Sequence, residues 1–188
     1  MNFDLNKKIL RDVNQNLQNV DRKKNTRKFE ILNPQGQHAI CAGLKDDIEV
    51  TIKGHTGYYC AGMNQKATVT IHGNVGTGVA ENMMSGKIVV KGNASQSAGA
   101  TGHGGALIIE GDESSRCGLS MRGIDIVVKG KVKSLGADCV EKKMDQKNID
   151  ELGKLFKKLD ISEDPKKFKR YGSSRNLYNF KIDNVGAY

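Results

Sequence analysis

The stretch VTIHG, from Val69 to Gly73, decides the fold because its pattern recurs along the chain at a constant spacing. The related stretches are VTIKG, IVVKG, LIIEG and a second IVVKG, whose glycines are Gly54, Gly92, Gly111 and Gly130. Each glycine lies 19 residues from the next one. Repetition at a fixed period of this length is the sequence signature of a repeat architecture such as a solenoid.

The residues before each glycine alternate in polarity, which is typical of a strand with one buried face. The positions four and two before the glycine are apolar throughout: Val50, Val69, Ile88, Leu107, Ile126, and Ile52, Ile71, Val90, Ile109, Val128. The position just before the glycine is polar: Lys53, His72, Lys91, Glu110, Lys129. Six residues after the glycine the side chains are small, and we expect them to point inward as well: Cys60, Val79, Ala98, Cys117.

One strand every 19 residues, with no helical stretch between strands, excludes a doubly wound fold. We therefore predict an all-β fold: a right-handed parallel β-helix (β-solenoid) of about five to six coils, whose strands stack at ~4.8 Å. The glycine after each strand is then a corner of the coil. Glycine there permits a positive φ and removes a side chain that would collide with the next coil.

The chain divides into three predicted parts. Residues 1–30 comprise an amphipathic helix over Asp4–Val20, with Asp4 as its N-cap, and the basic linker DRKKNTRK. Residues 31–140 form the β-helix domain, into which FEILNP and HAICAGL lead as strands. Residues 141–188 comprise a second amphipathic helix, about Asp145–Leu159, and a tail. We expect the two helices to cover the open ends of the solenoid, because unpaired strand edges invite aggregation.

The tail FKRYGSSRNLYNFKIDNVGAY combines aromatic residues with Arg and Lys and shows little periodicity. That composition is typical of a segment that contacts a partner protein. A tail that packs along its own solenoid is the alternative, and the sequence favours neither interpretation.

Charge and composition argue against a nucleic-acid-binding protein. The net charge is +9, but residues 31–140 hold ten basic and nine acidic residues, so the excess lies at the two ends. Aromatic residues make up 5% of the chain and Trp is absent, which leaves few platforms for stacking bases. The sequence has no apolar run near the ~20 residues of a membrane span. Its polar N-terminus does not resemble a secretory signal, so we expect a cytoplasmic protein.

The four cysteines have no C-x-x-C spacing, which indicates neither a zinc site nor a disulfide framework. Cys60 and Cys117 share a column but lie three coils apart, roughly 14 Å at the strand spacing given above, which is too far for a disulfide. If the solenoid extends back to Cys41, that residue stacks on Cys60. We expect Cys41, Cys60, Cys117 and Cys139 to be reduced.

No catalytic, cofactor-binding or metal-binding residue is predicted. The segment after VTIHG contains Gly76 and Gly78 and could be mistaken for a phosphate-binding loop. Such a loop requires a true helix after the strand, within a βαβ unit, so we interpret the cluster as a bend of the coil. His72 is expected on the surface and His103 in a turn, whereas His38 and His55 fit no site. Other polar residues suggest no acid–base pair and no shared site: Asp46, Asp47, Asp112, Asp125, Arg116, Arg122.

Two long segments carry a resemblance to a known family. GYYCAGMNQKATVTIHGNVGTGVAENMMSG and GNASQSAGATGHGGALIIEGDESSRCGLSMRGIDIVVKG resemble the Gly-X-Gly-X-Gly domain, the right-handed β-helix at the C-terminus of the glutamate synthase large subunit. With SLGADCVEKKM and the tail, residues 30–188 are most similar to the free-standing subunits B of N-methylglutamate synthases (methylamine–glutamate N-methyltransferases). That family has two further coils between a residue like Gly130 and KVKSLGADC, which this chain lacks.

The resemblance implies a non-catalytic subunit of an enzyme complex. Its partners would be a glutamine-amidotransferase-like subunit and a glutamate synthase-like subunit that carries FMN and an iron–sulfur cluster, with no cofactor on this chain. The complex would convert methylamine and glutamate to N-methylglutamate and ammonia. The alternatives are a β-helix subunit of glutamate synthase proper or of formylmethanofuran dehydrogenase, a self-assembling structural solenoid, and an enzyme that binds a nucleotide at the glycine clusters.

Overall fold

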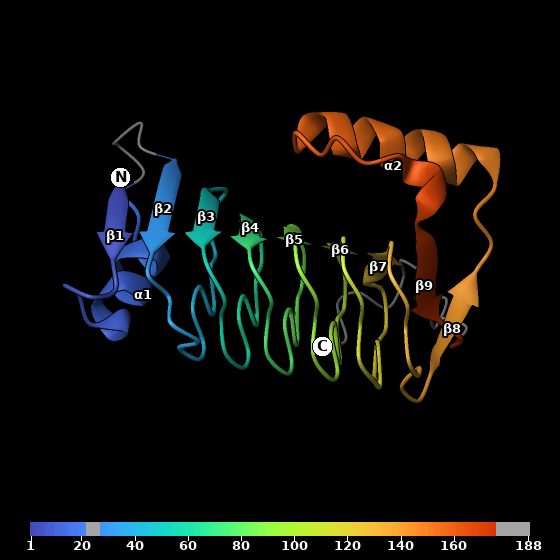
Figure 1. The fold of residues 1–188 in the computed structure, drawn as a ribbon, viewed down its shortest axis with the longest axis horizontal. Coiled ribbons are helices and arrows are strands. Elements are labelled where there is room, and N and C mark those ends of the chain that lie inside the picture. Colours follow the sequence, from blue (N-terminus) through green and yellow to red (C-terminus); the bar gives the residue numbers. More distant parts are fainter. Residues whose placement is uncertain (22–26, 176–188) are drawn as a thin grey trace, which may run out of the picture.

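The strands of the 19-residue repeat stack in parallel to form one face of a solenoid (Figure 1). The computed structural model describes residues 1–21 and 27–175. Most of the predicted basic linker and the last part of the tail therefore lie outside the described residues. The elements in chain order are β1 (Asn2–Asp4), α1 (Leu10–Gln18), β2 (Lys28–Leu32), β3 (Glu49–Lys53), β4 (Thr68–His72), β5 (Lys87–Val90), β6 (Ala106–Ile109), β7 (Asp125–Val128), β8 (Cys139–Lys142), α2 (Gln146–Lys158), the short 3-10 helix η1 (Pro165–Lys167) and β9 (Lys169–Ser173).

The register of the sheet follows the repeat. From β3 to β7 each residue lies opposite the one 19 positions later, as with Val50 and Val69. The first coil is longer, because Ile31 of β2 lies opposite Ile52 of β3. The predicted β-solenoid is confirmed, and FEILNP does contain a strand.

The interior is built from stacked columns of side chains. Both predicted strand columns and the column of small residues that includes Cys60 and Cys117 are buried. Cys41 is buried in the first coil and all four cysteines are free, as predicted. The sequence analysis missed one inward-facing column, which makes parallel bridges from coil to coil two residues after each corner glycine: Thr56, Val75, Ala94, Glu113, Val132. The first four are buried and Val132 is partly buried.

The corner glycines are required by close approach rather than by backbone conformation. Gly54 alone among them has a positive φ, at 133°. A Cβ added at Gly73 would lie 2.5 Å from the carbonyl carbon of Gly54, and one added at Gly130 would lie 2.4 Å from the carbonyl oxygen of Gly111. The expected positive φ was therefore wrong at four corners, whereas the expected collision with the neighbouring coil is correct.

A ladder of side-chain hydrogen bonds runs along these corners. His55 Nδ1 accepts a hydrogen bond from the backbone N–H of Asn74 at 2.9 Å, and Asn74 Oδ1 accepts one from Asn93 at 2.9 Å. Asn93 Oδ1 accepts from Asp112 at 2.8 Å, and Asp112 Oδ1 accepts from Lys131 at 2.7 Å. The ladder ends at Lys131, because an ammonium group has donors only.

The N-terminal segment differs from the predicted helix over Asp4–Val20. Residues Asn2–Asp4 form strand β1, which pairs with β2 and buries Phe3. Asp4 accepts hydrogen bonds from the backbone N–H of Asn6 and from the Asn33 amide, so it stabilises a turn and does not cap a helix. Helix α1 begins only at Leu10, and Ile9 is 71% exposed. The apolar spacing misled the prediction because Leu5 belongs to the strand end and not to the helix.

The predicted strand HAICAGL is also wrong. Residues 38–44 form turns, with left-handed φ angles at Ala39 (57°), Cys41 (60°) and Gly43 (68°). They occupy the bend of the first coil, since the Ala39 N–H bonds to the Tyr58 carbonyl and the Gly43 N–H to the Gly62 carbonyl. Helix α1 packs below this bend, where the Asn14 side chain donates to the Ala39 carbonyl and accepts from the Cys41 N–H.

Helix α2 forms where it was predicted, with Asp145 as its N-cap, but it covers a face rather than an end. It lies across the outer face of β5–β7 (Figure 1). The second apolar cluster joins Leu152 and Phe156 of α2 to outward-facing residues of the sheet and to later residues: Val89, Ile108, Val127, Ile161, Phe168. The edge of β7 is instead covered by β9, which pairs antiparallel with both β7 and β8. The first part of the tail thus packs on its own solenoid.

Candidate interaction surfaces

The outer face of the sheet is divided into a covered half and an uncovered half. The outward position three before each corner glycine is Thr51 and Thr70 in β3 and β4, and Val89, Ile108 and Val127 in β5 to β7. Helix α2 covers the three aliphatic positions. This change from threonine to aliphatic residues in one column was the signal in the sequence that could have placed α2 on the face.

Beside the end of α2, the uncovered half forms a hollow that we call the polar shelf. Its lining includes Lys28, Glu49, Thr51, Thr70, His72, Lys91 and Lys158. His72 lies on the surface, as predicted. Partial burial lowers the pKa of His72, and the nearby charges of Lys53 and Lys91 lower it further. Lys91 pairs with Glu110 at 2.5 Å and Lys28 with Glu49 at 3.0 Å, so much of the positive charge is already balanced.

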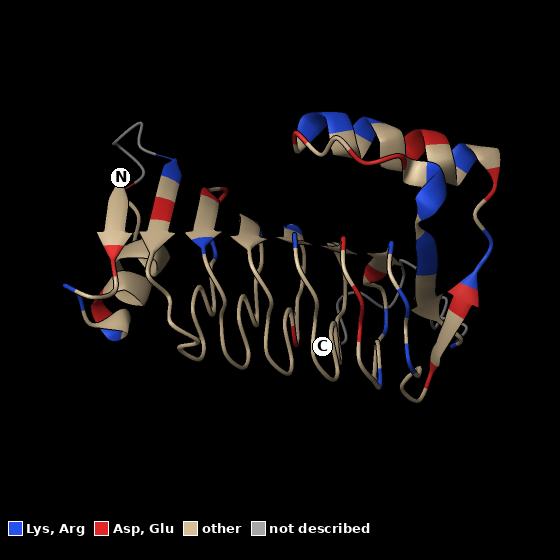
Figure 2. Ribbon diagram, viewed as in Figure 1, with Lys and Arg blue, Asp and Glu red and all other residues tan. Residues whose placement is uncertain are grey.

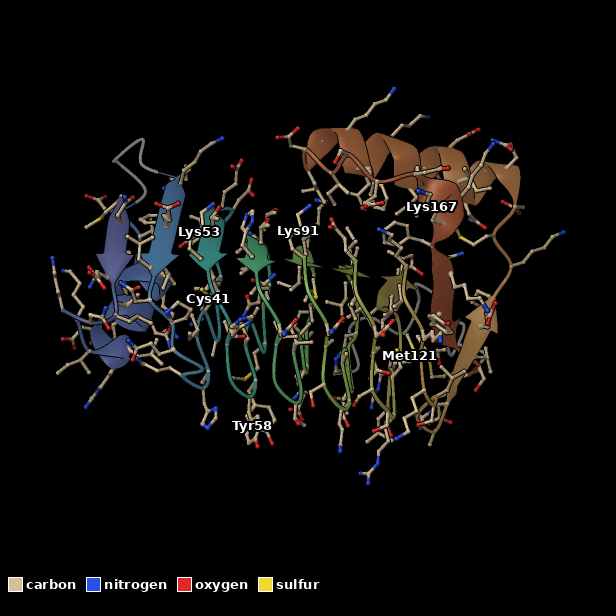
Figure 3. The ribbon with its side chains drawn as sticks, in the orientation of Figure 1. Cys41, Lys53, Tyr58, Lys91, Met121 and Lys167 are labelled. Carbon is tan, nitrogen blue, oxygen red and sulfur yellow. The ribbon has the colours of Figure 1, made fainter. Side chains whose placement is uncertain are left out.

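A second surface lies on the bends of the coils. We call the exposed side chains of His38, Tyr58, Tyr59 and Met63 the aromatic ledge. The rings of His38 and Tyr58 stack with centroids 4.5 Å apart, and Tyr59 meets Tyr58 edge-on. Both tyrosines are 50% exposed and Met63 is 53% exposed. Figure 3 shows Tyr58 at the tip of the coils, far from Lys53 and Lys91 at the strand ends. Few charged residues lie on the coils between β3 and β6 (Figure 2).

The glycine cluster that resembles a phosphate-binding loop is occupied by these tyrosines. A Cβ added at Gly76 would lie 2.8 Å from Tyr58 Cδ1, and one added at Gly78 would lie 2.7 Å from Tyr59 Cδ1. The amides are also engaged: the Gly76 N–H bonds to the Thr56 carbonyl and the Gly78 N–H to the Gln96 carbonyl. Residues 79–84, which follow the cluster, form turns and not a helix. The interpretation of the cluster as a bend is confirmed.

The other residues considered in the sequence are spread over the molecule. His103 is exposed in a turn-rich segment, as expected, and its N–H bonds to the Met83 carbonyl. Asp112 belongs to the corner ladder, and Asp125 makes two hydrogen bonds to Arg170, at 2.9 and 3.1 Å. Arg116 and Arg122 are both exposed.

The described residues meet neither the requirements of a metal site nor those of a membrane-spanning helix. Within residues 1–21 and 27–175, no three His, Cys, Asp or Glu side chains are grouped so that they could hold a metal ion. In the same ranges, no helix has both the length and the apolar character needed to cross a membrane.

One group of titratable residues lies inside the last coil, and the sequence analysis missed it. Glu113 is buried in the bridge column, where other coils carry Thr, Val or Ala. Burial raises the pKa of Glu113 to about 7. The backbone amides of Ala98 and Ser115 favour its ionised form, but neither carboxylate oxygen makes a hydrogen bond of regular geometry with a described residue. The negative charge of Glu113 acts to raise the pKa of the nearby Cys117, Cys139 and Tyr171 side chains.

Comparison with known proteins gives one partial relative. Protein GlxC of Rhizobium meliloti (strain 1021) is 55% identical to the chain over 60 residues, which is 31% of this chain and 26% of that protein. The matched region thus spans about a quarter of the length of this relative. No protein-family model matches the chain, and no solved structure matches it. The match shows that part of the chain is similar to GlxC.

Proposed function

We propose that the chain is a non-catalytic β-helix subunit of a glutamate synthase-like enzyme complex. Two observations support this proposal beside the fold: the resemblance of the repeat segments to the Gly-X-Gly-X-Gly domain and the partial similarity to GlxC. More specifically, we propose N-methylglutamate synthase, with an amidotransferase-like subunit and a subunit that holds FMN and an iron–sulfur cluster as partners. In this proposal the chain positions the other two subunits.

The observation that carries the proposal is that the glycine clusters of the repeat serve packing, whereas exposed tyrosine and methionine side chains lie on the bends. The glycine clusters accept the tyrosine rings and backbone of the preceding coil, and their amides bond to neighbouring coils. Four of the large apolar side chains that remain exposed lie instead on the bends, where Tyr58, Tyr59 and Met63 are joined by Met84 (49% exposed) of the next coil. Exposed Tyr and Met are typical of protein–protein contacts.

The test is co-expression of the full chain, carrying an affinity tag, with the subunits encoded by neighbouring genes. We expect a flavin-containing complex that forms N-methylglutamate from methylamine and glutamate. The chain purified alone should turn over neither glutamine nor methylamine. Turnover by the chain alone, or a tagged chain that retains no flavoprotein, would contradict the proposal.

The aromatic ledge offers a sharper version of this test. Replacing Tyr58 and Tyr59 together by Ser should reduce retention of a partner subunit by at least tenfold. The reason is that truncating a central tyrosine of a protein interface often costs about 2 kcal/mol of binding free energy. Replacement of Lys7 and Lys8, which precede α1 at the N-terminal end of the molecule, by Ser serves as the control. Circular dichroism should remain that of the parent chain in both variants.

The self-assembling solenoid remains the second candidate, but the ends of the molecule do not favour it. Strand β9 runs antiparallel along β7, so a second copy cannot continue the parallel stack at that edge. Helix α1 packs beneath the first bend. Filaments that lengthen with protein concentration, seen by electron microscopy, would support self-assembly over the subunit proposal.

A further inference from the structure

Two cysteines from different parts of the chain meet inside the last coil. Cys117 lies in the bend that follows β6, and its backbone bridges to Leu135. Cys139 is the first residue of β8. The two thiols lie close enough for the pKa of each to depend on the other. The Cys117 side chain is wholly buried, whereas Cys139 is 6% exposed.

The backbone beside Cys117 is shaped to admit the second thiol. Gly118 has a φ of 63°, a conformation that favours glycine. A Cβ on Gly118 would lie 2.6 Å from Met121 Sδ, 2.8 Å from Cys139 Sγ and 3.2 Å from Cys139 Cβ. Any larger residue at this position would therefore displace both Met121 and Cys139. The close approach of the two cysteines depends on this glycine.

We propose that Cys117 and Cys139 form a site of reversible oxidation, at which a hydroperoxide converts the two thiols to an intramolecular disulfide. The equivalent place in other coils is filled by Cys60, Val79 and Ala98, so this column requires a small buried side chain but not a cysteine. The proposal is independent of the enzyme complex discussed above.

The two sulfur atoms differ in a way that assigns them roles. The neighbouring Cys117 thiol lowers the pKa of Cys139, and Cys139 is the more exposed of the two. The Cys139 thiol and burial both raise the pKa of Cys117. Cys139 is therefore the residue that attacks the peroxide, because the thiolate is the nucleophile and needs access. Cys117 is the residue that resolves the product.

The reaction balances with hydrogen peroxide as the oxidant. The Cys139 thiolate attacks one peroxide oxygen, the O–O bond breaks, and a sulfenic acid forms while hydroxide leaves and takes a proton to become water. The Cys117 sulfur then attacks the Cys139 sulfur, the S–O bond breaks, and a second water leaves with the Cys117 proton. Two thiols lose two electrons and two protons in total, and one peroxide is reduced to two waters.

The disulfide would join the last coil to the β8–β9 hairpin. At present the hairpin is held to the solenoid by three residue pairs between β7 and β9 and by side-chain pairs such as Arg170–Asp125. A covalent link closing this loop would hold the hairpin, and the α2 segment between β8 and β9, against the solenoid. Oxidation should therefore raise the thermal unfolding temperature of the chain.

The experiment treats the reduced full chain with a small excess of hydrogen peroxide, blocks the remaining thiols, and digests with trypsin without reduction. We expect one cross-linked product, in which the peptide of residues 117–122 is joined to that of residues 134–142 with the loss of two hydrogens. Dithiothreitol should restore the separate peptides. Cys41 and Cys60 should stay reduced and should react with the blocking reagent only after the chain is unfolded. Both are fully buried, and burial raises the pKa of both thiols.

Single-residue variants separate the two roles. In Cys117→Ser we expect the sulfenic acid at Cys139 to persist and to react with dimedone; in Cys139→Ser we expect Cys117 to stay reduced. Gly118→Ala serves as a second probe and should slow cross-linking at least tenfold relative to the parent, judged only if its circular dichroism is unchanged. The proposal is overturned if peroxide leaves the 117–122 and 134–142 peptides unlinked, or if Cys41–Cys60 or intermolecular links form instead.

Discussion

Asn74 Oδ1 accepts a hydrogen bond from the backbone N–H of Asn93, the residue that occupies the same place one coil further on. The same relationship joins Asn93 to Asp112 and Asp112 to Lys131. A short side chain with an acceptor thus replaces the bond that a regular strand would make at the corner. The ladder connects every coil from His55 to Lys131 by a contact independent of the apolar core.

Removing one acceptor from the ladder should weaken the fold slightly. Asn93→Ala leaves the Asp112 N–H without its partner, and we expect a loss of about 0.5–1.5 kcal/mol in the free energy of unfolding, since this corner is exposed to water. Urea unfolding followed by circular dichroism gives the value. Asn93→Asp is the matched control and should cost less, because Asp112 makes the same bond in the next coil. Equal losses in both variants would show that the ladder does not contribute.

Adding a methyl group at a corner glycine should destabilise the chain, whereas adding one at the glycine inside α2 should not. At Gly92 a Cβ would lie 2.4 Å from Asn74 Oδ1 and 2.7 Å from the Gly73 carbonyl oxygen, so Gly92→Ala should destabilise the chain by about 2–3 kcal/mol. Gly153 lies inside α2, and a Cβ there would meet its nearest atom, Pro165 Cγ, at 3.6 Å. Gly153→Ala should therefore stabilise α2 by up to about 1 kcal/mol. Thermal unfolding of both variants checks the opposite signs.

The buried carboxyl of Glu113 should make stability depend on pH. Its folded-state pKa of about 7 exceeds the ordinary glutamate value of 4.5, so the folded chain favours the protonated form. The penalty is absent below pH 4.5, grows as the pH rises toward 7, and is complete above 7, where it amounts to about 3 kcal/mol.

Glu113→Gln should remove this dependence. We expect the variant to be more stable than the parent at pH 8 and to differ little from it at pH 5. Urea unfolding at both values measures the difference. A variant that is less stable than the parent at pH 8 would show that the carboxylate is favourably bound in the folded chain.

The attachment of α2 rests on the aliphatic half of the outer column. Ile108→Thr gives β6 the residue type found at Thr51 and Thr70 and removes apolar contact with Phe156 and its neighbours. We expect a loss of about 1–3 kcal/mol and faster hydrogen exchange of the α2 amides. The control is Thr70→Ser on the uncovered half, which should leave exchange in α2 unchanged. Uniformly faster exchange over all coils would show instead that α2 unfolds only with the solenoid.

The period of the repeat predicted most of the fold because each column obeys one simple physical demand. Val69 and Ile71 recur as apolar residues since every coil buries the same two positions, and Gly73 recurs since every corner approaches the preceding one. Helix α2 was equally predictable, because its amphipathic spacing and the Asp145 cap depend on local sequence alone.

The failures occurred where the decisive partner lies far away in the sequence. Phe3 reads as the residue before a helix, yet it is buried because β1 pairs with β2 beyond α1. Cys139 looks isolated, and only the return of the chain at β8 brings it to Cys117. Tyr58 and Tyr59 could be placed on a bend from the sequence. That their rings pack against Gly76 and Gly78 of the next coil can be inferred only once the stacking of the coils is known. The surfaces by which the chain would contact partners therefore could not be inferred from the repeat.

The corner ladder has a consequence for how the length of this molecule can change. Because each rung joins equivalent positions, deletion or duplication of one whole repeat would leave every remaining rung intact and change the separation of the two ends by a step of ~4.8 Å. An insertion of any other length would leave the rungs paired only if its extra residues were looped out of the coil. Anything attached to opposite ends of the solenoid is therefore held at one of a discrete set of distances, fixed by backbone spacing and insensitive to the identity of the surface side chains.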